Sequence, residues 1–319
     1  MASLAAARRA GGAAGASLLS HFAPRATAIG LPREASLAAL GRLAARGLSN
    51  AAPAPPRASM DGAASHDFSG ALAALALYFD ALHLRDAGRM REVWHPSAHL
   101  KRVDPEGGLV DIDANRFLEI VGEASGERAP NQHLRDKVLG IDFAGPGTAL
   151  AKVEISLGAT TYTDFLSLLR LREGWRVVAK LFASRPAGSP TFVDATPPAS
   201  AHGEVGATLS EYVAACRTSD GQRLRAVLHP SCCTFAARRD GALREVSADA
   251  FVERTSSVYA ALPPGEGPAK YAKVVSIDKS GPNTAAAKVQ TGYALGAGQL
   301  AVDPDAGAGD FLFTSHLLL

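Results

Sequence analysis

The same twelve-residue motif occurs twice in this sequence, and the repeat constrains the fold more than any other feature. The first copy is DAGRMREVWHPS at 86–97, and the second is DGQRLRAVLHPS at 220–231. Internal self-similarity of this kind indicates a duplicated structural unit. Seven positions are identical, namely Asp86/Asp220, Arg89/Arg223, Arg91/Arg225, Val93/Val227, His95/His229, Pro96/Pro230 and Ser97/Ser231.

The similarity continues on both sides of this motif. Each copy spans about 120 residues, a common size for one domain. We therefore expect two tandem units, at 66–186 and 204–319, joined by a Pro/Ser/Ala-rich linker at 187–203. The further matches are Tyr78 with Tyr212, Phe117 with Phe251, and IDFAGPGTALAKV at 141–153 with IDKSGPNTAAAKV at 277–289.

Composition indicates an ordinary globular protein. The chain has 319 residues, of which 47% are apolar and 20% charged, enough apolar surface for two cores. A formal charge of +2 argues against a nucleic-acid-binding protein, and no apolar run is long enough to span a membrane. Cys216, Cys232 and Cys233 lack CxxC spacing, which favours reduced structural thiols.

The first sixty residues differ from the rest of the chain. Their arginines are opposed by a single acid, Glu34, and leucines recur at near-helical spacing across 37–48. This basic amphipathic pattern is typical of an organellar transit peptide, and its arginine content favours a mitochondrion over a plastid. The alternative is a disordered tail on a cytoplasmic protein, which the APAPPR segment at 52–57 favours.

Hydrophobic periodicity predicts an α+β order in the first unit. A helix at 68–84 precedes a short helix that has Asp86 as its N-cap and stops at Pro96. His95 is then expected in the last helical turn, where it would cap carbonyl groups. Helices covering one face of a curved antiparallel sheet are the expected result. The remaining elements are a strand at 98–103, a helix at 114–121 and strands at 134–143, 148–157, 160–171 and 175–182.

The second unit repeats this order with two departures. An insertion with the composition of a flexible hairpin tip, at 294–310, precedes the strand at 311–319. Nothing corresponds to the last strand of the first unit, GWRVVAKLF at 174–182. The strand at 311–319 is then an unprotected edge, which favours an incomplete C-terminus over coverage by another segment or self-association. The other expected elements are helices at 207–216, 222–229 and 248–259 and a strand at 233–238.

This set of elements resembles the nuclear-transport-factor-2-like superfamily. The resemblance is carried by HPSA at 95–98 and by YTDFLSLL at 162–169 before GWRVV at 174–178. Within the superfamily, the chain is most similar to the SnoaL-like group described as putative lumazine-binding proteins. This implies two cone-shaped α+β units, each a curved antiparallel sheet covered by helices, packed as an intrachain pseudo-dimer. It implies no single reaction, because the fold carries isomerases, cyclases, dehydratases and non-catalytic modules.

The resemblance to the ketosteroid isomerases of this superfamily implies a candidate pocket in the first unit. Carried over by position, their oxyanion-hole tyrosine falls on Tyr78 and their protonated acid on Asp164. The position of their catalytic base is Arg102, and because arginine stays protonated the isomerase reaction is not supported. The equivalent positions of the second unit are Tyr212, Ser315 and Ala236.

Two interpretations of this pocket stay open. In the first, Tyr78, Arg102 and Asp164 bind a small carbonyl or anionic ligand, either without turnover or as a SnoaL-type isomerase, lyase or cyclase with His99 as base. In the second, Arg102 pairs with Asp164 and fills the pocket of a scaffold or assembly module. No metal or cofactor site is expected, because the histidines lack ligand spacing and the turn at 145–147 lacks the lysine of a phosphate loop.

Overall fold

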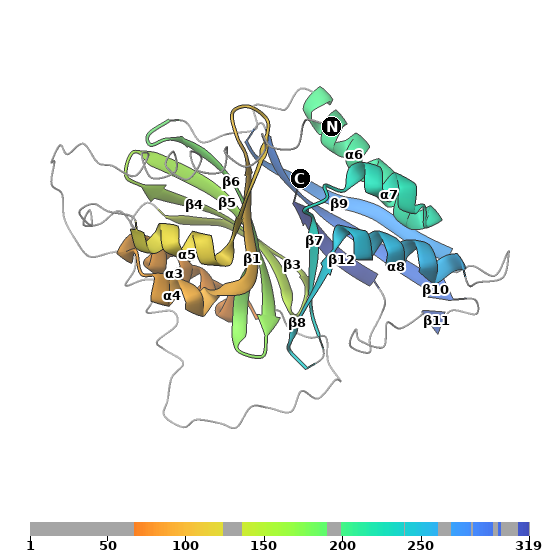
Figure 1. Cartoon of the computed structure of the whole chain (residues 1–319), viewed down its shortest axis with the longest axis horizontal. Coiled ribbons are helices and arrows are strands. Elements are labelled where there is room, and N and C mark those ends of the chain that lie inside the picture. Colours follow the sequence, from red (N-terminus) through yellow and green to blue (C-terminus); the bar gives the residue numbers. More distant parts are fainter. Residues whose placement is uncertain are drawn as a thin grey trace, which may run out of the picture.

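The structure is a computed structural model that describes two units lying side by side (Figure 1). The described residues are 67–123, 136–189, 199–238, 240–260, 269–281, 283–295, 299–300 and 312–318. The segment expected to target the protein, at 1–60, lies outside them, as do linker residues 190–198 and most of the insertion at 294–310. Those expectations stay predictions.

The first unit consists of three helices on a six-stranded sheet. The strand order is β2-β1-β6-β5-β4-β3, and neighbouring strands are antiparallel except for the parallel pair β1 and β6. The helices are α3 (Phe68–Leu84), α4 (Ala87–Val93) and α5 (Ala114–Glu123). The strands are β1 (Trp94–Val103), β2 (Leu109–Asp113), β3 (Lys137–Gly145), β4 (Thr148–Leu157), β5 (Thr160–Leu171) and β6 (Gly174–Pro186).

One face of this sheet forms the core with the helices. Side chains alternate between the two faces of a strand, so Val153 and Ile155 of β4 face the same way, toward Leu75 of α3. Phe117 of α5 and Trp94 of β1 complete this core, with ring centroids 4.5 Å apart. The helix-covered face is therefore the interior into which the candidate site residues must point.

Helix α4 ends earlier than the sequence predicts. Its last residue is Val93, and Trp94 already has extended backbone angles (φ −95°, ψ 121°). A residue that precedes proline is disfavoured in the helical region, which explains why the helix stops before His95. His95 therefore caps no helix; its Nδ1 accepts a hydrogen bond from the backbone N–H of Ser97 at 3.1 Å.

The repeated motif has the same local structure in both units. His229 Nδ1 accepts from the N–H of Ser231, also at 3.1 Å. The expected N-cap is confirmed, because Asp86 accepts from the N–H of Arg89 at 3.0 Å, and its repeat counterpart Asp220 does the same for the following turn. The identical residues of the motif thus form the same local hydrogen bonds in both units.

The second unit has the same order of elements but a divided sheet. In the described part of the chain, no strand joins β12 to β7, whereas β6 joins the equivalent strands of the first unit. Helix α6 begins at Ala199, inside the segment expected to be linker, so the linker is shorter than predicted. The helices are α6 (Ala199–Thr218), α7 (Gly221–Val227) and α8 (Ala248–Ala260). The strands are β7 (Cys233–Ala237), β8 (Leu243–Ser247), β9 (Ala269–Gly281), β10 (Thr284–Leu295), β11 (Gln299–Leu300) and β12 (Leu312–Leu318).

Strand register supports the alignment of the two copies. In the first unit Asp164 lies opposite Val153, and in the second Ser315 lies opposite Val289. Val153 and Val289 are the last residues of the matched segments, so Asp164 and Ser315 occupy the same place in the two sheets. The duplication is therefore a duplication of strand pairing as well as of sequence.

The two units contact each other through the sheet faces that their helices leave uncovered. Leu150 and Phe165 of the first sheet pack against Ala286 of β10. A second apolar cluster joins β5 and β6 to the β7–β8 hairpin; its members are Leu169, Leu171, Val178, Phe235, Ala237 and Leu243. This is the sheet contact expected of an intrachain pseudo-dimer.

Two reciprocal ion pairs cross this contact. Lys152 Nζ donates to Asp278 Oδ1 at 2.7 Å, and Lys288 Nζ donates to Asp142 Oδ1 at 2.7 Å. Lys152 corresponds to Lys288 in the repeat, and Asp142 to Asp278. Each lysine also donates to a backbone oxygen of the other unit, at 2.9 Å and 2.8 Å. Equal contacts in both directions are the mark of an isologous interface.

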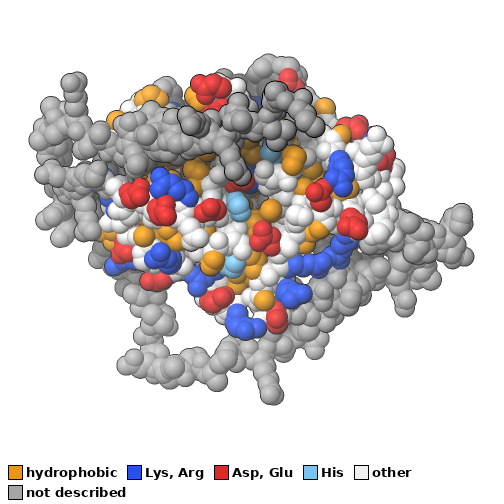
Figure 2. Space-filling view, viewed as in Figure 1, with side chains coloured by type: hydrophobic (Ala, Val, Ile, Leu, Met, Phe, Trp, Pro, Cys, Tyr) orange, Lys and Arg blue, Asp and Glu red, His pale blue; other side chains and the backbone are white. Residues whose placement is uncertain are grey.

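One face of the described part of the molecule carries mixed charge (Figure 2). On the face shown in Figure 2, basic and acidic side chains intermingle over the described atoms. Within the described ranges, no helix is both long enough and apolar enough to cross a membrane.

Candidate binding site in the first unit

Three polar side chains meet on the helix-covered face of the first sheet. Tyr78 of α3 donates its hydroxyl hydrogen to Asp164 Oδ2 of β5 at 2.8 Å. Lys180 of β6 donates to the same Oδ2 at 2.8 Å and to the Tyr78 hydroxyl oxygen at 2.7 Å. The structure thus brings together Tyr78 and Asp164, as the resemblance implies, and adds a lysine that the sequence analysis did not identify.

Strand pairing determines that Asp164 and Lys180 both face the core of the first unit. Asp164 pairs with Val153 on one side and Phe182 on the other, and both neighbours belong to the core of the first unit. Lys180 lies beside Leu166 of β5 and Leu100 of β1, which belong to the same core. Residues directly opposite each other in a sheet share a face, so both polar side chains must point inward.

The cluster is enclosed by aromatic rings. Tyr78 and Asp164 are fully buried, and the Lys180 side chain is only 6% exposed. The Lys180 ammonium lies 5.1 Å from the ring centroid of Phe182, 5.5 Å from Tyr78 and 5.9 Å from Phe117. Such distances allow cation–π attraction, which offsets part of the cost of removing the ammonium from water.

Burial also alters the acidity of two tyrosines. Desolvation raises the pKa of Tyr78 well above its ordinary value, and the adjacent Asp164 carboxylate raises it further. Desolvation raises the pKa of Tyr162, two residues before Asp164 on β5, to about 12, with Asp164 adding to the effect. Both hydroxyls therefore stay protonated and can donate hydrogen bonds throughout the neutral range.

Three buried polar atoms at this site have no hydrogen-bond partner among the described residues. They are Asp164 Oδ1, Arg102 Nε and Trp94 Nε1. The Trp94 ring stacks on Tyr78 with centroids 6.4 Å apart. A buried polar atom without a partner costs about 1–3 kcal/mol, and a cluster of such atoms marks a place where a polar ligand or water can bind.

Arg102 does not play the role that the second interpretation of the pocket gives it. It shares the inward face of β1 with Leu100, two residues before it, and its positive charge lowers the pKa of Tyr162. The ion pair with Asp164 is made by Lys180 instead. No described residue pairs with the Arg102 guanidinium, which leaves it available beside Tyr162.

His99 lies on the other face of the same strand. Its Nδ1 is 2.8 Å from Asp111 Oδ1 of β2, and Lys101 contacts the same carboxylate. The Lys101 ammonium also donates to the backbone oxygen of Ser231, which places this group at the boundary with the second unit. The structure therefore separates His99 from Tyr78, Arg102 and Asp164 by the thickness of the sheet.

A second buried pair lies at the end of α3. His83 Nε2 is 2.5 Å from Asp136 Oδ2, with both side chains less than a tenth exposed. The Asp136 charge contributes to the raised pKa of Tyr78, so the pair lies close enough to influence the site. No grouping of three or more His, Cys, Asp or Glu side chains suitable for a metal ion occurs in the described residues.

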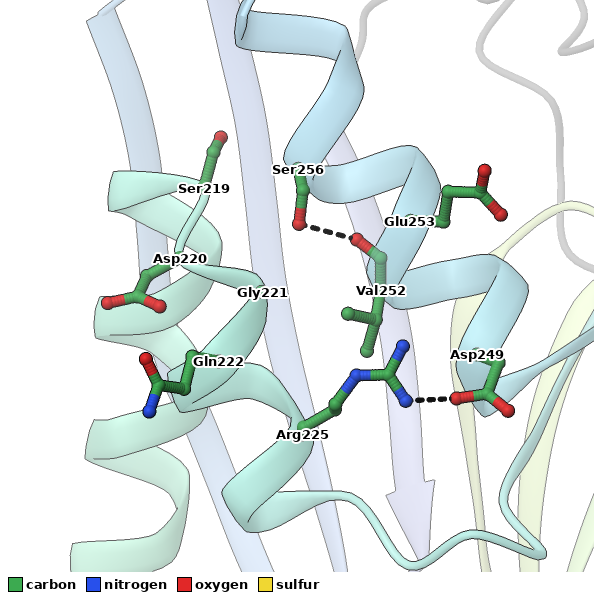
Figure 3. A pocket seen from close by; sticks show the side chains of 9 residues that line it. All are labelled: Ser219, Asp220, Gly221, Gln222, Arg225, Asp249, Val252, Glu253 and Ser256. Atoms are coloured by element: carbon green, nitrogen blue, oxygen red, sulfur yellow. Dashed lines mark hydrogen bonds and ion pairs between the residues drawn. The ribbon is translucent and has the colours of Figure 1, made fainter.

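The second unit offers a different set of groups. Tyr212 is buried at 8% exposure, whereas Arg102 is replaced by Ala236 and Asp164 by Ser315, whose side chain is outside the description. An open hollow lies between α7 and α8 of this unit, and Figure 3 shows its lining. The Arg225–Asp249 pair there is solvent-exposed, at 59% and 79%, so the hollow lacks a buried polar centre.

Comparison with protein families gives a match to both units. A family model described as "Putative lumazine-binding" matches residues 66–183 and again residues 200–296. Two successive matches to one family model agree with a tandem duplication.

Individual relatives match the length of one unit. The curated protein "Aldolase FrzH" from Cladobotryum sp. is 28% identical over 127 residues, which are 38% of this chain and 94% of that protein. An NTF2-like protein of unknown function from Shewanella baltica OS155 is 21% identical, with a TM-score of 0.34, over 38% of this chain and 95% of that one. Another, from Silicibacter pomeroyi DSS-3, is 21% identical, with a TM-score of 0.32, over 37% and 94%.

Proposed function

The chain belongs to the family described as putative lumazine-binding, and on that premise we propose that its first unit binds a small ligand carrying a carbonyl or carboxylate group. The ligand lies on the helix-covered face of the first sheet. The unpartnered Trp94 Nε1 and Arg102 Nε offer hydrogen-bond donors to it, and Arg102 also supplies a positive charge.

One observation carries this proposal. Asp164 is fully buried, its Oδ2 accepts from both Tyr78 and Lys180, and its Oδ1 is buried without a partner. A cluster whose only task was to fill the core would satisfy all its polar atoms, because a half-satisfied buried network is unfavourable. Buried polar groups converging within an apolar enclosure are typical of small-molecule sites.

A thermal-shift screen with lumazine, a steroid and pyruvate tests the proposal. A bound ligand at about a hundred times its dissociation constant stabilises the protein by roughly 2.7 kcal/mol, a readily measured shift. Arg102→Met should weaken binding of a carboxylate ligand by about 1.5–3 kcal/mol, because it removes a hydrogen bond to a charged group. Lys101→Met, on the outward face of the same strand, serves as the control. Equal loss in both variants would overturn the assignment of Arg102.

A second candidate function is a lyase or isomerase acting on a carbonyl compound. The matched relative from Cladobotryum sp. is named an aldolase, and this supports chemistry at a carbonyl group in the same kind of unit. Donors beside a buried carboxylate can stabilise the oxyanion that develops when such a carbon reacts. Turnover of a ligand found in the screen, lost in Tyr78→Phe, distinguishes this function from binding alone.

We also propose that residues 1–60 direct the protein to an organelle, a mitochondrion rather than a plastid. The support is their composition, rich in arginine and alanine with a single acidic residue. Fusion of these residues to a fluorescent protein should send it to mitochondria, whereas replacing the arginines with glutamine should leave it cytosolic. A cytosolic signal from the unaltered fusion would contradict the proposal.

A further inference from the structure

We propose that Lys180 is a nucleophile that forms a covalent imine with an aldehyde or ketone held in the first unit. The inference rests on the proposed function, because the carbonyl compound must reach the helix-covered face of the sheet. It goes beyond that function by naming a covalent step, the atom that performs it and the class of compound that it accepts.

The surroundings of Lys180 are those that make a lysine reactive. Its side chain is 6% exposed and its ammonium lies among the rings of Tyr78, Phe117 and Phe182. Lysine nucleophiles of enzymes are commonly found in desolvated, apolar surroundings of this kind. The other described lysines that form ion pairs are more exposed than Lys180. The side chain of Lys101, for example, is 20% exposed.

The neighbours of Lys180 supply the required proton transfers. Asp164 Oδ2, 2.8 Å from Nζ, can accept a proton from the ammonium and leave a neutral amine. The Tyr78 hydroxyl, 2.7 Å from Nζ and 2.8 Å from the same Oδ2, can relay protons between the amine, the carboxylate and the oxygen of the substrate. These three groups form a closed hydrogen-bonded triangle in which a proton can move without entering water.

The step balances with no added reagent. The neutral amine adds its electron pair to the carbonyl carbon, and the carbonyl oxygen becomes a hydroxyl by taking a proton from the nitrogen through Tyr78. Asp164 then returns its proton to that hydroxyl, which leaves as water while the nitrogen electron pair forms the C=N bond. Overall, one ammonium and one carbonyl group give one protonated imine and one water. The positive charge stays on the same nitrogen, beside the Asp164 carboxylate.

The unpartnered oxygen of Asp164 gives the imine a further use. Oδ1 is buried and accepts no hydrogen bond in the described structure. A protonated imine acidifies the hydrogens on the neighbouring carbon, and a carboxylate oxygen held within the same enclosure is a suitable base for them. The cluster therefore contains both the nucleophile and an acceptor for the next proton.

Two carbonyl probes test the inference on the full chain. Pentane-2,4-dione, which is uncharged, forms an ultraviolet-absorbing enaminone with reactive lysines, and pyruvate forms an imine that cyanoborohydride reduces to a stable adduct. Peptide mapping by mass spectrometry then locates each adduct. We expect labelling of Lys180 about tenfold above that of Lys101, the matched lysine in an exposed ion pair. Lys180→Arg keeps the charge and should abolish the enaminone band, whereas Lys101→Arg should leave it unchanged.

The outcomes separate this inference from the proposed function. Binding of pyruvate is measured by equilibrium dialysis without reductant. If pyruvate binds and Lys180 carries no adduct with either probe, the covalent step is wrong and the binding function stands. If neither binding nor an adduct is found, both fail. Should Lys180→Arg not fold, the adduct map of the unaltered chain decides alone, since labelling of Lys180 no greater than that of Lys101 overturns the inference.

Discussion

The two units of this protein keep the same scaffold but differ in their interiors. In both, an aspartate caps the short helix, a histidine accepts the N–H of the serine two residues later, and one residue before the cap adopts a left-handed backbone, Arg85 at φ 55° and Ser219 at φ 57°. The polar groups of the first interior are kept only in part, because Tyr78 has a counterpart in Tyr212 but Ala236 and Ser315 replace Arg102 and Asp164.

The residues that the units share indicate what the second unit does. Lys152 and Asp142 have their repeat counterparts in Lys288 and Asp278, and these four side chains form the two reciprocal ion pairs between the sheets. The duplication thus retains the residues that build each scaffold and join the units, whereas the buried polar cluster is described in one unit. We infer that the second unit supports the first, and that the first holds the ligand.

The largest expected effect compares a buried ion pair with an exposed one. Lys180→Met leaves the Asp164 carboxylate in the core without its cation and should lower the free energy of unfolding by about 3–5 kcal/mol. Arg225→Ala, in the exposed pair of the second unit, should cost less than about 1 kcal/mol. Urea denaturation of both variants measures the difference.

A double substitution provides the control for that comparison. Lys180→Met with Asp164→Leu removes both charges together, and should recover most of the lost stability because no unpaired charge remains in the core. If the double variant is no more stable than Lys180→Met alone, the loss comes from packing and the two charges are not coupled.

Two equivalent glycines test how the units are joined. Gly107 and Gly241 occupy the same turn of each unit, and both have a positive φ, of 86° and 78°. A Cβ on Gly107 would meet nothing within 4 Å, whereas one on Gly241 would lie 2.8 Å from the backbone nitrogen of Arg172 in the other unit. Gly241→Ala should therefore cost about 2–3 kcal/mol, against roughly 1 kcal/mol for Gly107→Ala. Equal thermal shifts would indicate that this hairpin does not rest on the first unit.

Alkaline pH should affect the first unit through Tyr162. Its folded-state pKa of about 12 exceeds the ordinary value of 10.0, so the folded protein retains the proton that the unfolded chain loses. The associated stability is fully present below pH 10 and is lost as the pH rises through 12, with an expected loss of roughly 2–3 kcal/mol. Tyr162→Phe should reduce this loss, and the second unit already has Phe313 at the equivalent position. An unchanged pH profile in the variant would contradict the assignment.

The smallest effect concerns the symmetry of the interface. Lys152→Ala and Lys288→Ala each remove one ion pair and one bond to a backbone oxygen, with partner carboxylates that are about half exposed. Each should lower the free energy of unfolding by about 1 kcal/mol, and by the same amount within error. A clear difference between the two would show that the interface is isologous in geometry but not in energy.

Much of the fold follows directly from the sequence. The helix at 68–84 and the strands at 148–157 and 160–171 have the predicted bounds, because their apolar periodicity is strong and turn residues flank them. The predicted end of α4 is wrong, because the sequence pattern favours a helix up to Pro96 whereas a residue before proline avoids helical angles. The signal for the correct end was present in His95-Pro96.

The candidate site was less predictable than the fold. Tyr78 and Asp164 were found through family resemblance, but Lys180 was missed. Simple alternation along β6 would put Lys180 on the same face as Val178, which contacts the second unit. The pairing of β6 with β5 contains a bulge, where the register shifts between Ser167 and Leu168. The bulge shifts the inward–outward alternation of β6 by one residue, so that Lys180 points inward. Single-sequence periodicity carries no signal for such a bulge.

The number of ligand sites per chain tests the central claim most directly. Isothermal titration should be carried out with whichever of lumazine, a steroid or pyruvate gives the largest thermal shift, on the full chain and on the variant that combines Lys180→Met with Asp164→Leu. We predict one site per chain, and loss of that site in the variant, because both altered residues belong to the buried cluster of the first unit. Two equivalent sites per chain, or an unchanged affinity in the folded variant, would contradict the account.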